Sequence, residues 1–169
     1  RDHLVIPAGS WGRTDTLAAD RLLDWREEWR FFKRFQVAER DGLARRSEPI
    51  HIEVAFAGEQ IGDASREIRL VEEGSEEEIP CQVYGQESVG GTESGSIVFL
   101  ADVEPHQEKG YLILYGNSAD GLAAPSYATD LVTTGREYAL EIENSYYKVS
   151  LSSLMGQLKN LEFKRWGKT

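Results

Sequence analysis

The sequence predicts an all-β protein: a small antiparallel β-sandwich with an N-terminal arm, followed by the first strands of a second β-domain. Apolar and polar residues alternate in many short segments, as in strands that bury one face. Turn residues separate these segments at short intervals, which is typical of a sandwich. Hydrophobic residues make up 40% of the chain, as in ordinary globular proteins. The predicted parts are an arm with a short helix (1–28), a β-sandwich (29–118), a linker loop (119–136) and the opening β-meander of a second β-sandwich domain (137–169).

The N-terminal arm combines an irregular start with a short helix. Pro7, Gly9 and Gly12 interrupt any regular pattern over residues 1–16. Residues 17–28 carry leucines and a tryptophan at spacings that loosely fit one helical face. We therefore expect a helix there, outside the sandwich strands.

Two segments rich in aromatic and β-branched residues open the sandwich. Residues 29–37 place Trp29, Phe31, Phe35 and Val37 on one parity, which predicts a strand. In residues 50–56, isoleucine, valine and phenylalanine alternate with polar or small residues. This second pattern predicts a strand with one buried face.

The remaining sandwich strands differ in how they are covered. Residues 68–71 predict a short strand, and Pro80 confines the following strand to an edge or to a start at that residue. Residues 85–95 are rich in glycine and serine and predict a flexible loop. Alternation returns in residues 97–103. Residues 111–115 are apolar on both parities, which predicts a central strand covered on both faces.

Residues 137–169 contain three further strand patterns joined by two turns. Three strands bury too little apolar surface to be stable alone. They either extend the sandwich or open a second domain, and we favour the second domain. The remainder of a larger protein, or a partner chain, would then complete it.

The charge of the chain is unevenly distributed. The formal net charge is -10, which argues against a nucleic-acid partner because phosphate contacts need clustered cations. The densest acidic stretch, residues 72–78, predicts a solvated hairpin loop. The alternative is a calcium site, but the D-x-[DN]-x-[DN]-G pattern of such a loop is missing, so we expect no metal.

Basic residues gather in the first third of the chain. They are Arg26, Arg30, Lys33, Arg34, Arg40, Arg45 and Arg46. They could contact an acidic polysaccharide through charge-assisted hydrogen bonds. They could equally pair with the acidic segment that follows them, and we favour this intramolecular or interdomain pairing.

The sequence lacks the motifs of several function classes. The single cysteine, Cys81, excludes an intrachain disulfide and a cysteine-based zinc cluster, and we expect it to be a buried structural thiol. No apolar run approaches the roughly 18 residues of a membrane helix, so we expect no membrane partner. No G-x-S-x-G turn or complete phosphate loop is present, and we expect no cofactor. His51 and His106 are expected to be exposed.

Several segments resemble parts of large carbohydrate-active proteins. Residues 143–151 (ENSYYKVSL), followed by residues 156–158 (GQL), are similar to the opening strands of the large β-sandwich in polysaccharide lyases of the rhamnogalacturonan exolyase type and in some glycoside hydrolases. Residues 111–117 resemble the last strand of the small sandwich in front of it, and residues 29–35 and 45–50 resemble its first two strands. The resemblance spans residues 25–165 and its motifs are structural. It implies a secreted or periplasmic protein whose later domains cleave uronic-acid-containing glycans.

Four residues are candidates for ligand contact. Trp11 and Trp25 lie outside the predicted strands, and aromatic rings stack on the apolar faces of sugars. Their alternative role is to fix the arm on a partner domain. Tyr146 and Lys148 are two residues apart and therefore share a strand face. They are candidates for a polar pair near a sugar, the alternative being a solvated strand face or an interdomain contact. No catalytic residue is identified.

Three functions remain open from these observations. The favoured hypothesis is a non-catalytic N-terminal portion of a polysaccharide-degrading protein, which supports the catalytic domain and contacts glycan. The second is a stand-alone carbohydrate-binding or adhesion module. The third is a structural interaction domain without a ligand. Glycan binding by the isolated chain would favour the second hypothesis.

Overall fold

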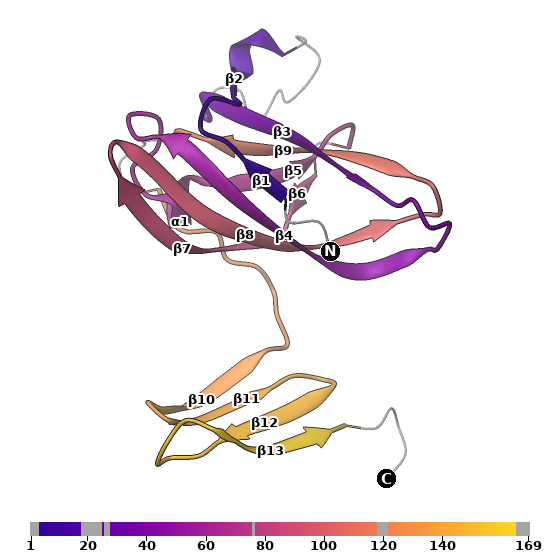
Figure 1. Ribbon diagram of the computed structural model, residues 1–169, viewed down its shortest axis with the longest axis vertical. Helices are drawn as coiled ribbons and strands as arrows, with labels where there is room; N and C mark the ends of the chain where they lie inside the picture. The colour runs from indigo at the N-terminus through magenta and orange to yellow at the C-terminus, as the bar shows by residue number, and fades with distance from the viewer. Residues whose placement is uncertain (1–3, 18–24, 26–27, 76, 118–121, 165–169) are drawn as a thin grey trace. The chain divides into compact units, whose positions relative to one another are not determined.

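A computed structural model confirms the all-β prediction and divides the chain into two units (Figure 1). Unit 1 is Arg1–Pro125 and unit 2 is Ser126–Thr169. The described residues are 4–17, 25, 28–75, 77–117 and 122–164. In this part of the chain, no helix is long and apolar enough to cross a membrane.

Sheet A of unit 1 has the strand order β1-β4-β8-β7. Its strands are β1 (Leu4–Ile6), β4 (Arg45–Ala57), β8 (Thr92–Val103) and β7 (Cys81–Val89). The long central strands β4 and β8 are antiparallel, whereas β1 runs parallel to β4. The prediction of an irregular start was therefore wrong for β1. A three-residue strand is too short to show alternation, and its partner lies far along the chain, at residues 52–54.

Sheet B of unit 1 has the strand order β2-β3-β9-β5-β6, and all its pairs are antiparallel. Its strands are β2 (Gly12–Arg13), β3 (Phe31–Ala38), β9 (Glu108–Tyr115), β5 (Arg69–Glu72) and β6 (Glu78–Ile79). A single turn of helix, α1 (Ala64–Glu67), precedes β5, and a 3₁₀ turn (Thr14–Thr16) follows β2. Both parts of the predicted arm that form strands, β1 and β2, thus belong to the sandwich.

The two sheets of unit 1 pack face to face over one hydrophobic core. Sheet A contributes Ile52, Val54 and Phe56, and sheet B contributes Phe35 and Tyr111 among others. The rings of Phe35 and Tyr111 stack with centroids 5.3 Å apart. This arrangement confirms the predicted sandwich, because the alternating apolar positions of both sheets meet in one layer.

A second, smaller cluster lies on the other face of sheet B. Trp29, Val71, Leu112 and Leu114 are buried there, with Trp25 packed against them. The prediction that residues 111–115 are covered on both faces is therefore confirmed. The prediction that Trp29 shares the face of Phe35 was wrong. Trp29 lies before the start of β3 at Phe31, so the alternation of side chains along β3 does not determine its direction.

Two details of the sandwich concern turns. Residues 85–95, predicted as a flexible loop, belong to a long hairpin in which β7 and β8 are joined at Gly90 and Gly91. Both glycines have a positive φ, at 60° and 78°, so small residues serve the turn rather than a loop. Pro80 lies between β6 and β7, where the chain passes from the edge of one sheet to the edge of the other, as expected.

Unit 2 is a four-stranded antiparallel sheet, sheet C. Its strands, in spatial order, are β10 (Val132–Arg136), β11 (Ala139–Glu143), β12 (Tyr147–Leu151) and β13 (Leu158–Phe163). The prediction of a linker over residues 119–136 was wrong for residues 132–136, because these residues form strand β10 of the sheet. The three predicted strands are confirmed. The predicted helix over residues 17–28 lies mostly outside the described residues.

The two faces of sheet C differ in polarity. One face carries Lys148, whose ammonium group lies 3.1 Å from the carboxylate of Glu141 and 3.7 Å from that of Glu143. By the strand register, the opposite face carries apolar side chains. We call these the apolar face of sheet C: Leu140, Ile142, Tyr147, Val149, Leu151, Leu161 and Phe163. None of the described residues of unit 2 is buried.

Candidate functional site

A cleft opens where the edges of the two sheets of unit 1 are incompletely covered. β2 pairs only with Phe31 and Phe32 of β3, and β1 pairs only with Ile52–Val54 of β4. Among the described strands, none pairs with the outer edge of β3 after Phe32 or with that of β4 before Ile52. The loop from β3 to β4 closes one end of the gap between these two edges.

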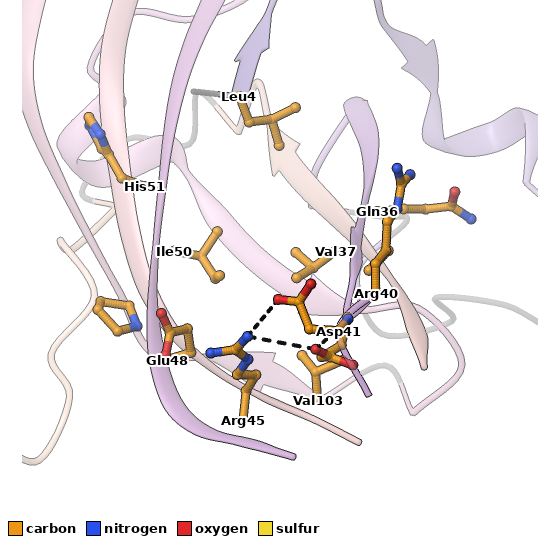
Figure 2. Close-up of a pocket in the computed structure, with 13 residues that line it drawn as sticks. Leu4, Gln36, Val37, Arg40, Asp41, Arg45, Glu48, Ile50, His51 and Val103 are labelled. Carbon is orange, nitrogen blue, oxygen red and sulfur yellow. Dashed lines mark hydrogen bonds and ion pairs between the residues drawn. The ribbon is translucent and has the colours of Figure 1, made fainter. Parts of the chain in front are cut away.

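The cleft has an apolar floor and a polar rim, and its volume is about 820 Å³. Figure 2 shows Leu4, Val37 and Ile50 pointing into the space between the strands, with His51 on the other side of β4. The floor consists of Leu4, Val37, Ile50 and Val103, and the rim includes Gln36, Arg40, Asp41, Arg45, Glu48 and His51. This combination suits a ligand that has both apolar and hydroxyl surfaces.

Glu39 anchors the loop at the closed end of the cleft. Its side chain is buried and accepts hydrogen bonds from the backbone amides of Asp41, Gly42 and His106 at 2.8–3.1 Å. Burial alone would raise the pKa of Glu39, but the hydrogen bonds from backbone amides lower it to about 2. Glu39 therefore stays ionised and fully engaged, so it holds the loop and is unsuited to act as a general acid or base.

Arg45 closes the same end of the cleft from β4. Its guanidinium group lies 3.0 Å from the carboxylate of Asp41 and 3.7 Å from that of Glu39 (Figure 2). Arg40 lies at the rim and is exposed. Among the groups described, Arg40 is thus the cation of the cleft that is best placed to meet a ligand.

The other cations of the basic cluster are used within unit 1. Arg34 pairs with Glu73 at 2.9 Å, and Arg46 pairs with Glu104. Glu73 belongs to the acidic stretch of residues 72–78, and Glu104 lies further along unit 1, so the predicted intramolecular pairing is confirmed for these two arginines. Arg30 instead donates to the carbonyl of Gly116 at 3.0 Å. Arg26 lies outside the described residues.

Lys33 is fully buried in the sandwich. Its ammonium group donates to the carbonyls of Pro7, Ala8 and Ser10 at 2.9, 3.2 and 2.9 Å. The ring centroid of Phe56 lies 5.6 Å from the same nitrogen, within the range of a cation–π contact. Lys33 therefore ties the segment between β1 and β2 to the core and is not available to an anionic ligand.

The predicted tryptophans lie in separate contacts of unit 1. Trp11 is 45% exposed, and its ring meets that of Phe31 edge-on at 5.4 Å. Trp25 is half-buried and packs edge-on against Trp29 at 5.2 Å. Trp25 thus serves the small cluster on sheet B. Neither tryptophan lines the cleft, and their predicted role in sugar contact stays a prediction.

The predicted pair of Tyr146 and Lys148 lies in unit 2. Tyr146 is half-exposed and belongs to the turn before β12, where its backbone amide donates to the Asn144 side chain at 2.9 Å. Lys148 is 3.1 Å from Glu141. The hydrogen bond and the negative charge of Glu141, with a further contribution from Glu143, raise the pKa of Lys148. The structure thus assigns Lys148 to a carboxylate cluster, and its role toward a sugar stays a prediction.

The acidic stretch of residues 72–78 forms the predicted hairpin, between β5 and β6. Two of its carboxylates lie beside cations: Glu72 is 3.1 Å from Lys109, and Glu78 is 3.4 Å from Arg69. In the described part of the chain, no group of three or more histidine, cysteine, aspartate or glutamate side chains is placed to hold a metal ion. Cys81 is partly buried and packs against the core, and His51 and His106 are exposed as predicted.

The residues of the cleft escaped the sequence-based search because they come from four strands and a loop. One signal was present in the sequence. Pro49 interrupts the alternation before residue 50, and a proline in a strand indicates an edge without a partner, as it did for Pro80. Ser47, with a positive φ of 49°, lies in the bulge beside it.

Comparison with known proteins gives no family for this chain. No protein-family model matches the sequence, and no curated protein is significantly similar to it.

Proposed function

We propose that the chain is a non-catalytic accessory portion of a carbohydrate-active protein of the polysaccharide-lyase type. Unit 1 contacts glycan through its cleft, and unit 2 joins the chain to the rest of the protein and supports its catalytic domain. The segments that resemble polysaccharide lyases give the carbohydrate context, and the same resemblance implies a secreted or periplasmic location.

The observation that carries this proposal is the chemistry of the cleft. Its apolar floor and polar rim match the alternating C–H and hydroxyl surfaces of a sugar chain. Its buried acid, Glu39, is held ionised by backbone amides and serves to fix the loop, so this residue supports binding rather than acid–base catalysis. Binding without cleavage is the behaviour expected of an accessory domain.

The apolar face of sheet C supports the second half of the proposal. Leu161 and Phe163 on this face are 42% and 69% exposed. A sheet normally buries its apolar face against a second layer. We infer that another β-sheet, from the remainder of a larger protein or from a partner chain, covers this face.

The test is titration calorimetry of the 169-residue protein against neutral and anionic hexasaccharides, with a parallel assay for their cleavage. We expect binding without cleavage. Arg40→Ala is expected to weaken binding several-fold, because it removes the exposed cation of the rim. Lys159→Ala, which removes an exposed cation from unit 2, is the matched control and should bind as the unaltered protein does.

Two results would refute the proposal. One is the absence of binding to every hexasaccharide at millimolar concentration. The other is cleavage of a hexasaccharide by the chain itself, since that would place catalysis in these residues.

A structural interaction domain without a ligand is the second candidate, because the exposed apolar face of sheet C by itself indicates an interface. The same titration separates the two functions. If the chain binds no glycan in this titration, the apolar face of sheet C remains as the observation that indicates a role, and the structural function is favoured.

A further inference from the structure

A second surface of unit 1 lies on the outer face of sheet A and carries a fixed pair of rings, one of which, His51, also belongs to the rim of the cleft. Tyr84 on β7 and His51 on β4 meet there across the central strand β8. The Tyr84 hydroxyl lies 3.1 Å from Nε2 of His51. The two rings are nearly parallel, at 15°, with centroids 6.0 Å apart. This contact holds the two rings in one orientation, so they form a preorganised aromatic surface.

Strand alternation places polar side chains around this ring pair. Ile52 and Val54 point into the core, so His51 and Glu53 point outward. Register places Ser96 between Glu53 and Tyr84, and Val98 between His51 and Gln82. We call the six outward residues the tyrosine platform: His51, Glu53, Gln82, Tyr84, Ser96 and Val98.

The platform is open to solvent. Tyr84 is 46% exposed, and Leu100, on the same face of β8, is 59% exposed. The opposite sheet differs, since its outer face is covered by Trp29 and its neighbours. An exposed tyrosine fixed by a hydrogen bond, on a face that no described residue covers, is available for stacking.

We propose that the tyrosine platform binds a neutral glycan, with a pyranose ring stacked on Tyr84. The ring supplies the apolar contact, since the C–H faces of a sugar pack on an aromatic surface. Glu53, Gln82 and Ser96 supply acceptors and donors for hydroxyl groups. The proposal rests on the function proposed above and adds a ligand class to it.

Charge determines which glycans suit this surface. Glu53 gives the platform a carboxylate, and none of its six residues is a lysine or an arginine. A uronate would bring a second carboxylate beside that of Glu53, and the six platform residues offer the uronate no lysine or arginine. The platform therefore selects neutral sugars, although the resemblance of the chain is to enzymes of acidic glycans.

The experiment is titration of the 169-residue protein with cellohexaose, mannohexaose and maltohexaose as neutral probes, and with hexagalacturonate as the anionic probe. At least one neutral probe should bind, and Tyr84→Ala should weaken its binding at least about tenfold. Tyr84→Phe keeps the ring but loses the hydrogen bond to His51, so its loss should be smaller. Tyr138→Ala removes a tyrosine of unit 2 that is 58% exposed, and this matched control should leave binding unchanged.

The possible failures distinguish this inference from the function proposed above. Binding that Arg40→Ala weakens and Tyr84→Ala leaves intact overturns the platform and retains glycan contact by the cleft. Binding of hexagalacturonate alone overturns the neutral selectivity. Absence of binding to all four probes overturns both proposals. The midpoint of urea unfolding should be the same for Tyr84→Ala and the unaltered protein, because the side chain lies on the surface.

Discussion

Lys33 shows how one residue can conflict with its surroundings and still be accommodated. A lysine in a sandwich core loses its hydration, and burial lowers its pKa to about 8. Three backbone carbonyls replace the lost water. Alternation along β3 places Lys33 on the core side together with Phe35, so its burial follows from its parity.

The depressed pKa of Lys33 predicts a dependence of stability on pH. A lysine in an unfolded chain titrates near pH ~10.4. Between pH 8 and that value the unfolded chain binds more protons at this site than the folded protein, so the free energy of unfolding rises with pH. We expect a rise of about 1–2 kcal/mol between pH 8 and pH 9.5 in urea unfolding, and Lys33→Met should abolish it.

The range of this measurement ends below pH 10 for a physical reason. Burial raises the pKa of Tyr111 to about 12 and raises that of Tyr115 further. Above the ordinary tyrosine pKa of about 10, the unfolded chain loses these two protons while the folded protein keeps them. The free energy of unfolding therefore falls as the pH rises further. Lys109→Met, which removes a partly exposed lysine, should retain the rise. A curve for Lys33→Met parallel to that of the unaltered protein would contradict the assignment.

At the residue scale, composition and parity predicted the core better than the site. Ile52, Val54 and Phe56 follow directly from alternation, because burial of one strand face is a local pattern. Glu39 could not be found in this way. Its role depends on the amide of His106, far along the chain, and no local pattern shows such a contact.

Among the elements, the β10–β11 hairpin depends on a single glycine. Gly135 has a φ of 92°, and a Cβ there would lie 1.9 Å from the carbonyl oxygen of Ala139. Alanine at this position cannot fit without moving the opposing backbone. The edge strand β10 therefore requires glycine at this position.

Gly135→Ala is expected to detach β10 from β11. Strain of about 1–3 kcal/mol corresponds to amide exchange that is about 5- to 140-fold faster in Val132–Arg136. Hydrogen exchange measured by mass spectrometry checks this expectation. Gly9→Ala is the control, because a Cβ at Gly9 meets no atom within 4 Å. Unchanged exchange in β10 would show that the hairpin tolerates a side chain there.

Elements were predictable where the pattern was long and were missed where it was short. β4 and β8 show apolar and polar residues that alternate over many positions, and β9 contains a continuous apolar run. β1, β2 and β10 have two to five residues and lie at sheet edges, so the alternation in each is too short to recognise. Glycine was misread in residues 85–95, because a tight hairpin turn and a loop share that residue type.

On the scale of the whole molecule, the exposed apolar face of sheet C predicts binding of a hydrophobic dye. The 169-residue protein should enhance the fluorescence of anilinonaphthalenesulfonate. Phe163→Ser removes a large apolar side chain from this face and should reduce the enhancement. Glu162→Ser alters the neighbouring residue on the polar face and should not. Equal fluorescence for both variants would mean that the dye binds elsewhere.

The central place of β9 in sheet B has a consequence for the synthesis of this protein. β9 is the last strand of unit 1 in the chain, yet it joins β3 to β5. Chains grow at about 5–20 residues per second. A nascent chain from which residues 108–115 have not yet emerged therefore has a second sheet without its central strand. Until Tyr115 emerges, the nascent chain exposes aromatic strands without a partner, and that interval is when a chaperone would be of most use to it.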